Sequence, residues 1–465
     1  MPLILPGNVA SAIGGGYDVD NSCRFNGSDS YMHWTDTGGS GSRVQFSISL
    51  WCKKCSNGAF NPLVLAYQDG DNFTNLQFNS SDQLQWYNET GNQIKGNLIT
   101  NRFFRDPSAW YHILAVFDSG NGTAGNRMRL YVNGTEETSF ATDANPDQNE
   151  SSWFNYQDKK VHLGYDTGDL GWAGSALAFN GYIAQFMLVD GTVLTPSDVG
   201  EFDSDSPTIW KPIDISSTSV GTNGAFLDFA DSDNLGDNEG IAGEDWTEVN
   251  LDATDSATDT PTNNFCTMNP LYKMDDPTTF SEGNCKAVVA GSSWAAQKGT
   301  IAVNTGKWYW EIKLSAGTIA NYFLGVQGIN VDEDAGSPQE VSPTVVWYNG
   351  DASIGVDGSY SGSHGALDQG DIMGIALDMD AGSYGQITIY DQNAASVSNV
   401  DLSSAADYVM PFGANVTSTS EFNFGGCSAF TISSAAADEN NYGNFEFEPP
   451  SGYLALCTKN LATDG

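Results

Sequence analysis

The hydrophobic and polar positions of residues 110–140 predict three consecutive strands. In residues 110–117 (WYHILAVF) both alternating sets of side chains are apolar, which is typical of a central strand buried between two layers. Residues 118–126 then collect Asp, Ser, Gly and Asn, which favour turns, and residues 128–132 (MRLYV) resume a strand. Asn133 and Gly134 are typical of a type I′ turn leading into residues 135–140. The pattern therefore predicts a three-stranded meander.

Similar short strands, separated by turn residues, recur along the chain and predict an all-β protein. The 465 residues include 51 glycines, and 12% are aromatic. The length suggests about three domain units, and the composition favours all-β sandwiches. The strands and turn signals along the chain predict two antiparallel β-sandwich (jelly-roll) domains joined by an acidic connector. The expected divisions are an N-terminal docking tail (1–16), a first sandwich (17–202), a connector with one or two strands (203–280), a second sandwich (281–458) and a C-terminal tail (459–465).

Charge excludes two classes of partner. The chain has 18 Lys and Arg against 58 Asp and Glu, a formal net charge of −40. Such a surface repels the phosphates of nucleic acids and of anionic membranes, so we expect neither nucleic-acid binding nor membrane insertion. Residues 1–10 lack a basic start and are interrupted by Pro2 and Pro6, which predicts neither a signal peptide nor a membrane helix. A disordered start is the alternative to a docking tail.

Cysteine usage indicates reduced thiols. Seven cysteines are an odd number spread over the whole chain, which does not describe a disulfide framework. Cys52 and Cys55 form the only CxxC sequence, and no second such pair or His pair accompanies it. On a strand these two side chains would point to opposite faces, so we expect neither metal binding nor redox activity there.

The order of motifs resembles two known kinds of domain. Residues 17–202 resemble a laminin-G-like, concanavalin A-type jelly roll in the succession FNGSDSY, FSISLW, WYHILAVFD, RMRLYVNG and LTPSDV. Residues 281–456 resemble a SPRY-like domain in GKWYWEIK, FLGV, GDIMGIALD, GQITIY and FNFG, although DQN follows the GQITIY strand where such domains usually carry an Asn-Gly turn. With the start MPLILPGNVASA, the whole chain resembles the fibre and adhesion-type structural proteins of marine tailed bacteriophages.

This resemblance implies a non-enzymatic structural protein of the virion exterior, synthesised in the host cytoplasm. Residues 1–12 would contact other virion proteins, and the sandwiches would contact the host cell surface or its glycans. A homo-oligomer is expected, with a trimer as one arrangement. The alternatives are a capsid-decorating head fibre or cement-type protein and, as the competing enzyme class, a polysaccharide depolymerase.

Carboxylate pairs provide little support for an enzyme. A retaining glycosidase needs two carboxylates about 5 Å apart, which residues i and i+2 of one strand can supply. Asp378 and Asp380 have this spacing but lie in a strand-to-turn segment, where we expect them to cap the turn. Glu446 and Glu448 precede two prolines in an edge-like segment and fit a solvated strand face.

The histidines do not indicate nucleophilic catalysis. His33, His112, His162 and His364 are far apart in the sequence, and none lies in a Ser or Cys elbow. His112, on the apolar strand, is expected to be a core residue. We therefore predict no catalytic residues and no organic cofactor.

Two kinds of binding site stay open. The resemblance to laminin-G-like sandwiches implies that calcium could bind at the loop rim, where hard oxygen ligands come from Asp69, Asp71, Asp231, Asp233 and Asp237. Solvated acidic loops are the alternative. Sugar binding would use rim aromatics beside polar groups. The candidates, each of which fits the core equally well, are Trp86, Tyr87, Trp153, Tyr156 and Trp172.

Overall fold

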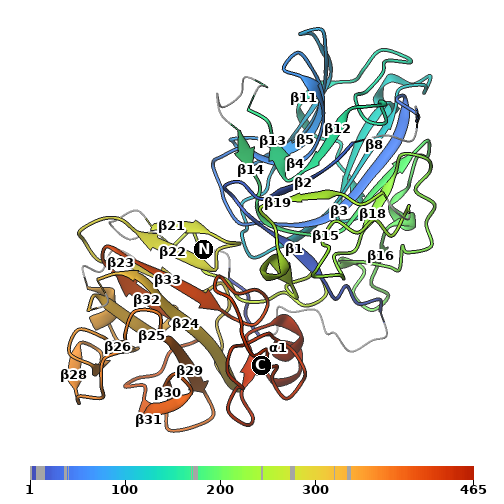
Figure 1. Cartoon of the computed structure of the whole chain (residues 1–465). Helices are drawn as coiled ribbons and strands as arrows, with labels where there is room; N and C mark the ends of the chain where they lie inside the picture. Colours follow the sequence, from blue (N-terminus) through green and yellow to red (C-terminus); the bar gives the residue numbers. More distant parts are fainter. Residues whose placement is uncertain are drawn as a thin grey trace. The chain divides into compact units, whose positions relative to one another are not determined.

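The computed structural model describes the chain except for residues 1, 2, 7–15, 36–38, 40, 169, 171–175, 242, 243, 273–277, 319 and 332–336. The chain divides into two compact units (Figure 1): residues 15–262, called here the N-terminal sandwich, and residues 1–14 with 263–465, called the C-terminal sandwich. Both are built from antiparallel sheets, which confirms the predicted all-β fold. In the described part of the chain, no helix is long and apolar enough to cross a membrane.

The N-terminal sandwich consists of two large sheets. Sheet 1 has the order β10 (Thr135–Glu136), β9 (Met128–Val132), β8 (Trp110–Asp118), β3 (Gln45–Lys54), β15 (Asn180–Asp190), β1 (Ser22–Asn26) and β20 (Ser256–Ala257), with β18 (Ala225–Leu227) also paired to β15. Sheet 2 has the order β11 (Phe140–Ala144), β7 (Ile94–Phe103), β6 (Gln83–Thr90), β5 (Asn72–Phe78), β4 (Asn61–Asp69), β12 (Lys160–Leu163), β2 (Tyr31–Thr35) and β19 (Thr247–Val249). Two short hairpins complete the unit: β13 (Tyr165–Asp166) with β14 (Leu177–Ala178), and β16 (Glu201–Phe202) with β17 (Trp210–Lys211).

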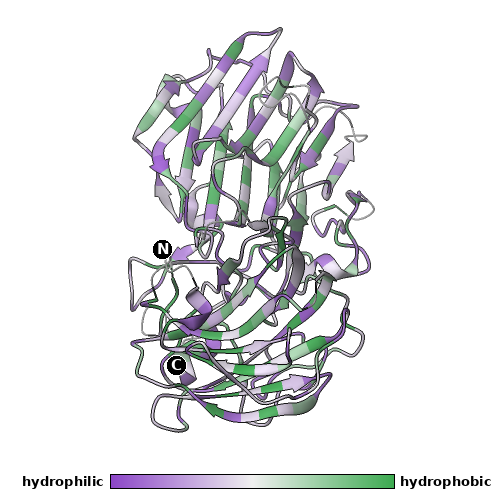
Figure 2. Ribbon diagram, turned by 90° about the vertical axis from the view of Figure 1, so that its left-hand side faces the viewer, coloured by the Kyte–Doolittle hydropathy of each residue, from purple (hydrophilic) through white to green (hydrophobic). Residues whose placement is uncertain are grey.

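The core of this unit fills the space between the inner faces of the two sheets. Phe46 of β3 stacks on Phe117 of β8 with ring centroids 5.2 Å apart, and Phe154 lies 5.0 Å from Phe46. Hydrophobic and hydrophilic residues alternate along many strands (Figure 2), as expected when one face of a sheet packs inward.

The meander predicted from residues 110–140 is confirmed over residues 110–136. Strands β8, β9 and β10 are neighbours in sheet 1, and Asn133 and Gly134 have φ angles of 48° and 73°, as a type I′ turn requires. The third strand is shorter than predicted, because Phe140 begins β11 and pairs with β7 in the other sheet. Strand β8 is apolar on both faces because Leu114 and other side chains of its outer face are buried under residues of the 193–241 segment.

That covering segment changes the expected domain boundary. Residues 203–262, predicted to be a connector, lie within the N-terminal sandwich, and β18, β19 and β20 pair with β15, β2 and β1. Buried ion pairs also hold the segment: Lys53 Nζ lies 2.7 Å from Asp259, and Arg24 lies 2.9 Å from Asp255. The apolar outer face of sheet 1 needs this cover, so the sandwich extends to residue 262 rather than 202.

The C-terminal sandwich also has two sheets. Sheet 3 has the order β21 (Thr278–Ser281), β22 (Lys286–Val289), β33 (Ser418–Asn423), β24 (Lys307–Gly317), β29 (Ile372–Asp378), β30 (Gln386–Asp391) and β31 (Ala394–Asp401), with β34 (Leu454–Ala455) added to β24 in parallel. Sheet 4 has the order β23 (Ala295–Lys298), β32 (Val409–Asn415), β25 (Tyr322–Gly328), β26 (Thr344–Tyr348), β27 (Ser353–Val356) and β28 (Ser359–Ser361). Its core is rich in tryptophan, with Trp308, Trp310 and Trp347 fully buried.

Both chain ends differ from the expected tails. Of the predicted docking tail, residues 3–6 are described, and Ile4 forms a β-bridge with Ile301 and packs on the core of the C-terminal sandwich. Residues 459–465, predicted to be a tail, fall largely in helix α1 (Thr458–Asp464), whose Leu461 is buried in the same core. An isoleucine or leucine that can bury its side chain against a core gains enough to order a chain end.

Candidate functional site

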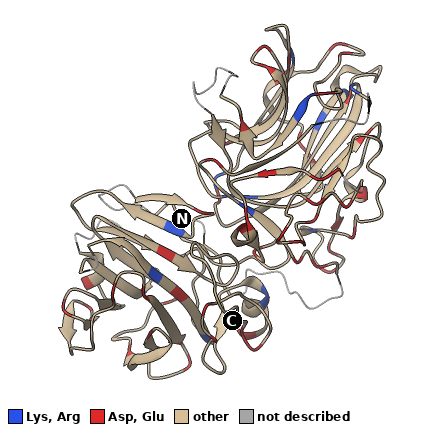
Figure 3. Cartoon of the chain, in the orientation of Figure 1, with Lys and Arg blue, Asp and Glu red and all other residues tan. Residues whose placement is uncertain are grey.

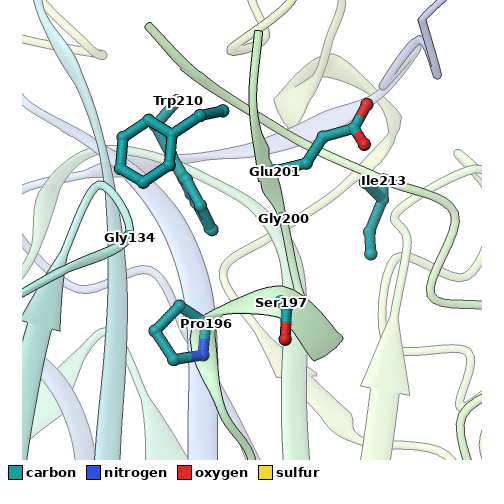
Figure 4. Close-up of a pocket in the computed structure, with 8 residues that line it drawn as sticks. Gly134, Pro196, Ser197, Gly200, Glu201, Trp210 and Ile213 are labelled. Atoms are coloured by element: carbon teal, nitrogen blue, oxygen red, sulfur yellow. The ribbon is translucent and has the colours of Figure 1, made fainter. Parts of the chain in front are cut away.

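A pocket of about 480 Å³ lies on the N-terminal sandwich, beside the β16–β17 hairpin (Figure 4). Three segments form it: the β9–β10 turn, which is distant in sequence, the stretch from the 3-10 helix η2 (Pro196–Asp198) to β16, and β17 with the residues after it. The lining residues are Gly134, Pro196, Ser197, Gly200, Glu201, Phe202, Trp210 and Ile213. In Figure 4, Trp210 lies above Pro196 and Ser197, Ile213 lies on the other side of the β16 strand, and the Glu201 carboxylate points away from Trp210.

Local sequence explains the walls of the pocket. Thr195 caps η2, because its backbone N–H donates to Asp198 Oδ2 at 2.7 Å, and Pro196 stands at the first helical turn. The turn between β16 and β17 is closed by Asp203, whose Oδ1 accepts the backbone N–H of Ser206 at 2.9 Å. The two strands then pair Phe202 with Trp210.

The Trp210 indole is fixed by two glycines. A Cβ atom on Gly134 would lie 2.2 Å from Trp210 Cε3, and one on Gly200 would lie 2.3 Å from Cζ2. Both positions therefore have to be glycine for the indole to fit. Phe202 meets the indole edge to face at 4.9 Å and is 45% exposed, so the aromatic pair is partly open to solvent. The result is a rigid aromatic wall.

Charged side chains lie on the same hairpin as Trp210 and Phe202. Glu201 Oε1 lies 3.2 Å and Asp203 Oδ2 lies 3.4 Å from Lys211 Nζ. The hydrogen bond to Glu201 raises the pKa of Lys211, and the backbone N–H groups of Ser206 and Asp205 lower the pKa of Asp203. Lys211 and Asp203 therefore stay charged at neutral pH.

This combination suits a polyhydroxylated ring. The C–H face of a sugar can pack on Trp210 and Phe202 while its hydroxyls donate to Glu201 or Ser197. Glycoside hydrolysis would need a carboxyl group whose pKa is raised so that it can donate a proton. The pKa of Asp203 is shifted in the opposite direction. Asp203 therefore does not have the raised pKa that a proton donor for glycoside hydrolysis needs.

The aromatic candidates on β6 are not at a rim. Trp86 is 0% exposed and belongs to the core between the sheets, so its prediction as a ligand-binding residue is wrong. Tyr87 points to the opposite face but is also buried, and its hydroxyl donates to Glu89 Oε2 at 2.5 Å. Burial, with this contact, raises the pKa of Tyr87. The alternation of a strand places neighbouring residues on different faces, and here both faces are covered.

Trp153 and Tyr156 lie together in the loop before β12, with ring centroids 5.4 Å apart. The Arg43 guanidinium lies 4.1 Å from the Tyr156 ring centroid and 5.0 Å from that of Trp153. Trp153 Nε1 also donates to the Glu89 carbonyl at 2.8 Å. These contacts engage both rings in the chain's own structure. Trp172 lies outside the described residues.

The first pair of calcium candidates closes a hairpin turn. Asp69 Oδ1 accepts the backbone N–H of Asp71 at 3.0 Å and the side-chain amide of Asn72 at 2.7 Å. Its carboxylate is thus used by the turn between β4 and β5, as the alternative of a solvated acidic loop suggests.

The second group of calcium candidates is also held in a turn. Asp231 Oδ1 accepts the backbone N–H of Asp233 at 2.9 Å. Burial and the nearby Asp245 raise the pKa of Asp237. Among the described residues, no group of three or more His, Cys, Asp or Glu side chains is placed to hold a metal ion.

The Asp378 and Asp380 pair caps a turn, as predicted. Asp378 Oδ1 accepts the backbone N–H of Asp380 at 3.0 Å, and Asp378 Oδ2 forms an ion pair with Lys307 at 2.9 Å. Asp380 Oδ1 accepts the backbone N–H of Gly306 at 3.1 Å. Both carboxylates therefore have structural partners.

Glu446 and Glu448 have different surroundings. Glu446 accepts the backbone N–H of Ser433 at 2.5 Å and also its hydroxyl, and these bonds outweigh partial burial, so that the pKa of Glu446 is lowered. Glu448 is exposed and lines a second pocket, of about 490 Å³, together with Asn393, Ala437, Asp438, Glu439, Pro449, Pro450 and Ser451. Asp438 in that pocket accepts the backbone N–H of Ala455 at 2.8 Å and helps to anchor the chain end.

The cysteines and His112 occupy the core. All seven cysteines are buried, including Cys52 and Cys55. His112 is buried as predicted, with Nε2 placed 2.9 Å from Ser49 Oγ. His33 and His162 are far apart in the sequence, but they lie opposite each other on adjacent strands.

Trp210 and Glu201 are the site residues that sequence reasoning missed. Trp210 lies in the stretch interpreted as a connector, and Glu201 lies at its border. The only feature of the sequence that could have indicated this site is that Trp210 is an isolated aromatic residue in an acidic segment. Its partner Gly134 is remote in sequence, so no local pattern joins the pocket together.

Comparisons with known proteins agree with the fold. No curated protein matches the chain. Among solved structures it is similar to the SPRY domain of human HERC1 (13% identity, TM-score 0.28, 35% of this chain and 99% of that chain covered). It is also similar to the heptameric SAP-like pentraxin of Limulus polyphemus (15% identity, TM-score 0.29, 39% of this chain and 81% of that chain covered). A human SPRY domain is similar as well (12% identity, TM-score 0.26, 32% of this chain and 94% of that chain covered). Residues 26–200 match the laminin-G family described as the concanavalin A-like lectin/glucanases superfamily, and the N-terminal sandwich has that jelly-roll fold.

Proposed function

We propose that this chain is a non-enzymatic glycan-binding protein and that the Trp210 pocket holds the sugar. The observation that carries the proposal is the pair of Trp210 and Phe202 rings in a pocket that Glu201 also lines. The superfamily matched by residues 26–200 includes lectins in its description, which supports the same class of ligand. The pocket volume of about 480 Å³ also falls within the usual range for small-molecule sites, about 300 to 1,000 Å³.

The pocket favours weak binding to each copy of the chain. Its polar contacts are few, and Glu201 is already engaged with Lys211. A glycan would therefore gain mainly from stacking on the aromatic wall. Display of many copies raises avidity by about 10² to 10⁴ without new contacts.

The setting that we propose is the exterior of a tailed-phage virion, as a fibre or adhesin that contacts the host surface. The order of the sequence motifs supports this setting, with synthesis in the host cytoplasm, a homo-oligomer such as a trimer, and attachment to other virion proteins through residues 1–12. The acidic residues, far more numerous than the basic ones (Figure 3), suit contact with neutral or cationic surface groups rather than nucleic acid.

A capsid-decorating head fibre is the alternative that uses the same attachment. A cryo-EM map of the particle separates the two, because density for the two sandwiches would lie on the tail in one case and on the capsid in the other.

Glycan arrays test the binding proposal. The chain, coupled to beads for multivalent display, is expected to bind a restricted set of glycans, and Trp210→Ala is expected to lower the signal at least tenfold. Glu201→Gln keeps the shape of the pocket and should also weaken binding. Trp153→Ala is the matched control, because that indole lies beside Arg43 and outside the pocket. Binding that survives both pocket substitutions would contradict the proposal.

A further inference from the structure

Two histidines face each other on the outer side of sheet 2. Strands β2 and β12 are antiparallel neighbours, and their register places His33 directly opposite His162. The two imidazole rings have centroids 5.9 Å apart. The core residues of these strands, such as Met32 and Val161, point to the other face. The pair therefore belongs to the outer surface of the sheet.

The polar atoms of this pair lack protein partners. His162 is 4% exposed, and neither its Nδ1 nor its Nε2 has a hydrogen-bond partner among the described residues. The same holds for Nδ1 of His33. Each buried polar atom left in this state costs about 1 to 3 kcal/mol. A buried imidazole with two unused nitrogens can accept a water molecule, an ion or another small group.

Aromatic rings enclose the pair. Tyr31 and Tyr165 each lie 5.9 Å from the His162 ring, and Tyr67 lies 6.5 Å from it. Tyr31 and Tyr165 stack with their centroids 4.0 Å apart. The nitrogens of the two imidazoles are therefore the atoms that a small ligand between these rings would contact.

We propose that His33 and His162 form a two-histidine site for a divalent transition metal of the Zn²⁺, Ni²⁺ or Cu²⁺ class. A Zn–N bond of about 2.1 Å places each ring centroid about 3.2 Å from the metal, so two rings on one ion lie about 5 to 6 Å apart. Imidazole favours these metals, whereas Ca²⁺ requires oxygen ligands. Half-buried His33 turns its nitrogen towards the ion, and water or an external donor takes the remaining positions.

Metal titration of the full chain tests this proposal. After treatment with a chelator, the chain is titrated with Zn²⁺, Ni²⁺ and Cu²⁺ in excess Ca²⁺, which occupies the surface carboxylates. We expect one equivalent to bind, with nitrogen hyperfine coupling from two imidazoles in the Cu²⁺ electron paramagnetic resonance spectrum. The thermal midpoint of the N-terminal sandwich should also rise.

Substitutions distinguish the pair from other sites. His33→Gln and His162→Gln should each abolish the binding of this equivalent of metal. Because His33 is half-buried, His33→Gln should affect folding less than His162→Gln. His112→Gln is the control, because His112 is buried elsewhere and contacts Ser49. The proposal is overturned if no metal binds, if Ca²⁺ displaces it, or if binding persists in His33→Gln.

Discussion

Replacing Asp259 tests whether residues 203–262 are part of the N-terminal sandwich. Asp259 Oδ2 lies 2.7 Å from Lys53 Nζ, and the two side chains are 1% and 0% exposed. Trp110 Nε1 also donates to Asp259 Oδ1 at 3.1 Å. In Asp259→Ala, buried Lys53 loses its carboxylate partner and Trp110 loses its acceptor.

The expected loss is large compared with the stability of a domain. Breaking a buried ion pair by removing one partner costs about 3 to 5 kcal/mol, because the remaining charge stays in a poorly solvated site. The total free energy of unfolding of a domain is about 5 to 15 kcal/mol. The double substitution Lys53→Met with Asp259→Leu removes both charges and should be less destabilising than Asp259→Ala alone.

Urea unfolding of the full chain provides the measurement, with the transition of the C-terminal sandwich as an internal control. Glu137→Ala is the matched surface variant, because its partner Arg102 has a side chain that is 43% exposed, and surface pairs contribute about 0 to 1 kcal/mol. If the 203–262 segment were a loose connector, Asp259→Ala would behave like Glu137→Ala. A change below about 1 kcal/mol would therefore refute its place in the sandwich.

Two further predictions concern pH. Burial lowers the pKa of His112 from 6.5 to about 3, so that between pH 7 and 5 only the unfolded state binds a proton at this residue. His112 should therefore account for about 2 kcal/mol of the stability that the N-terminal sandwich loses over this range. His112→Gln should remove this loss in urea unfolding; an unchanged pH dependence would contradict it. Burial raises the pKa of Glu311 from 4.5 to about 7, so the folded state holds the proton more tightly, and stability of the C-terminal sandwich should fall by about 3 kcal/mol as pH rises from 4.5 to 7. Glu311→Gln should abolish that slope, and a slope that persists would show that another group titrates.

The sequence alone was sufficient to predict strands and turns whose signal lies in neighbouring residues. The two apolar faces of β8 predicted a central strand, and Asn133 with Gly134 predicted a type I′ turn, because residue spacing and backbone preference determine both. The turn role of Asp378 was also accessible, since Asp380 follows two residues later in a short acidic turn.

The remainder depends on contacts between distant residues. Strand β18 has three residues, too few for a periodic pattern, and exists because it pairs with Phe186–Leu188 of β15. Trp86 and Trp210 are both tryptophans in mixed polar segments, yet one is core and the other lines a pocket. Only the fold, which places Gly134 against Trp210, separates them.

The claim that the Trp210 pocket binds a glycan without cleaving it is tested most directly by calorimetric titration. The chain is titrated with the oligosaccharide that binds best on the array, and reducing ends are measured in the same sample. We expect saturable binding that Trp210→Ala abolishes and Trp153→Ala retains, with no release of reducing ends. Unchanged binding by Trp210→Ala, or steady release of reducing ends, would contradict the claim.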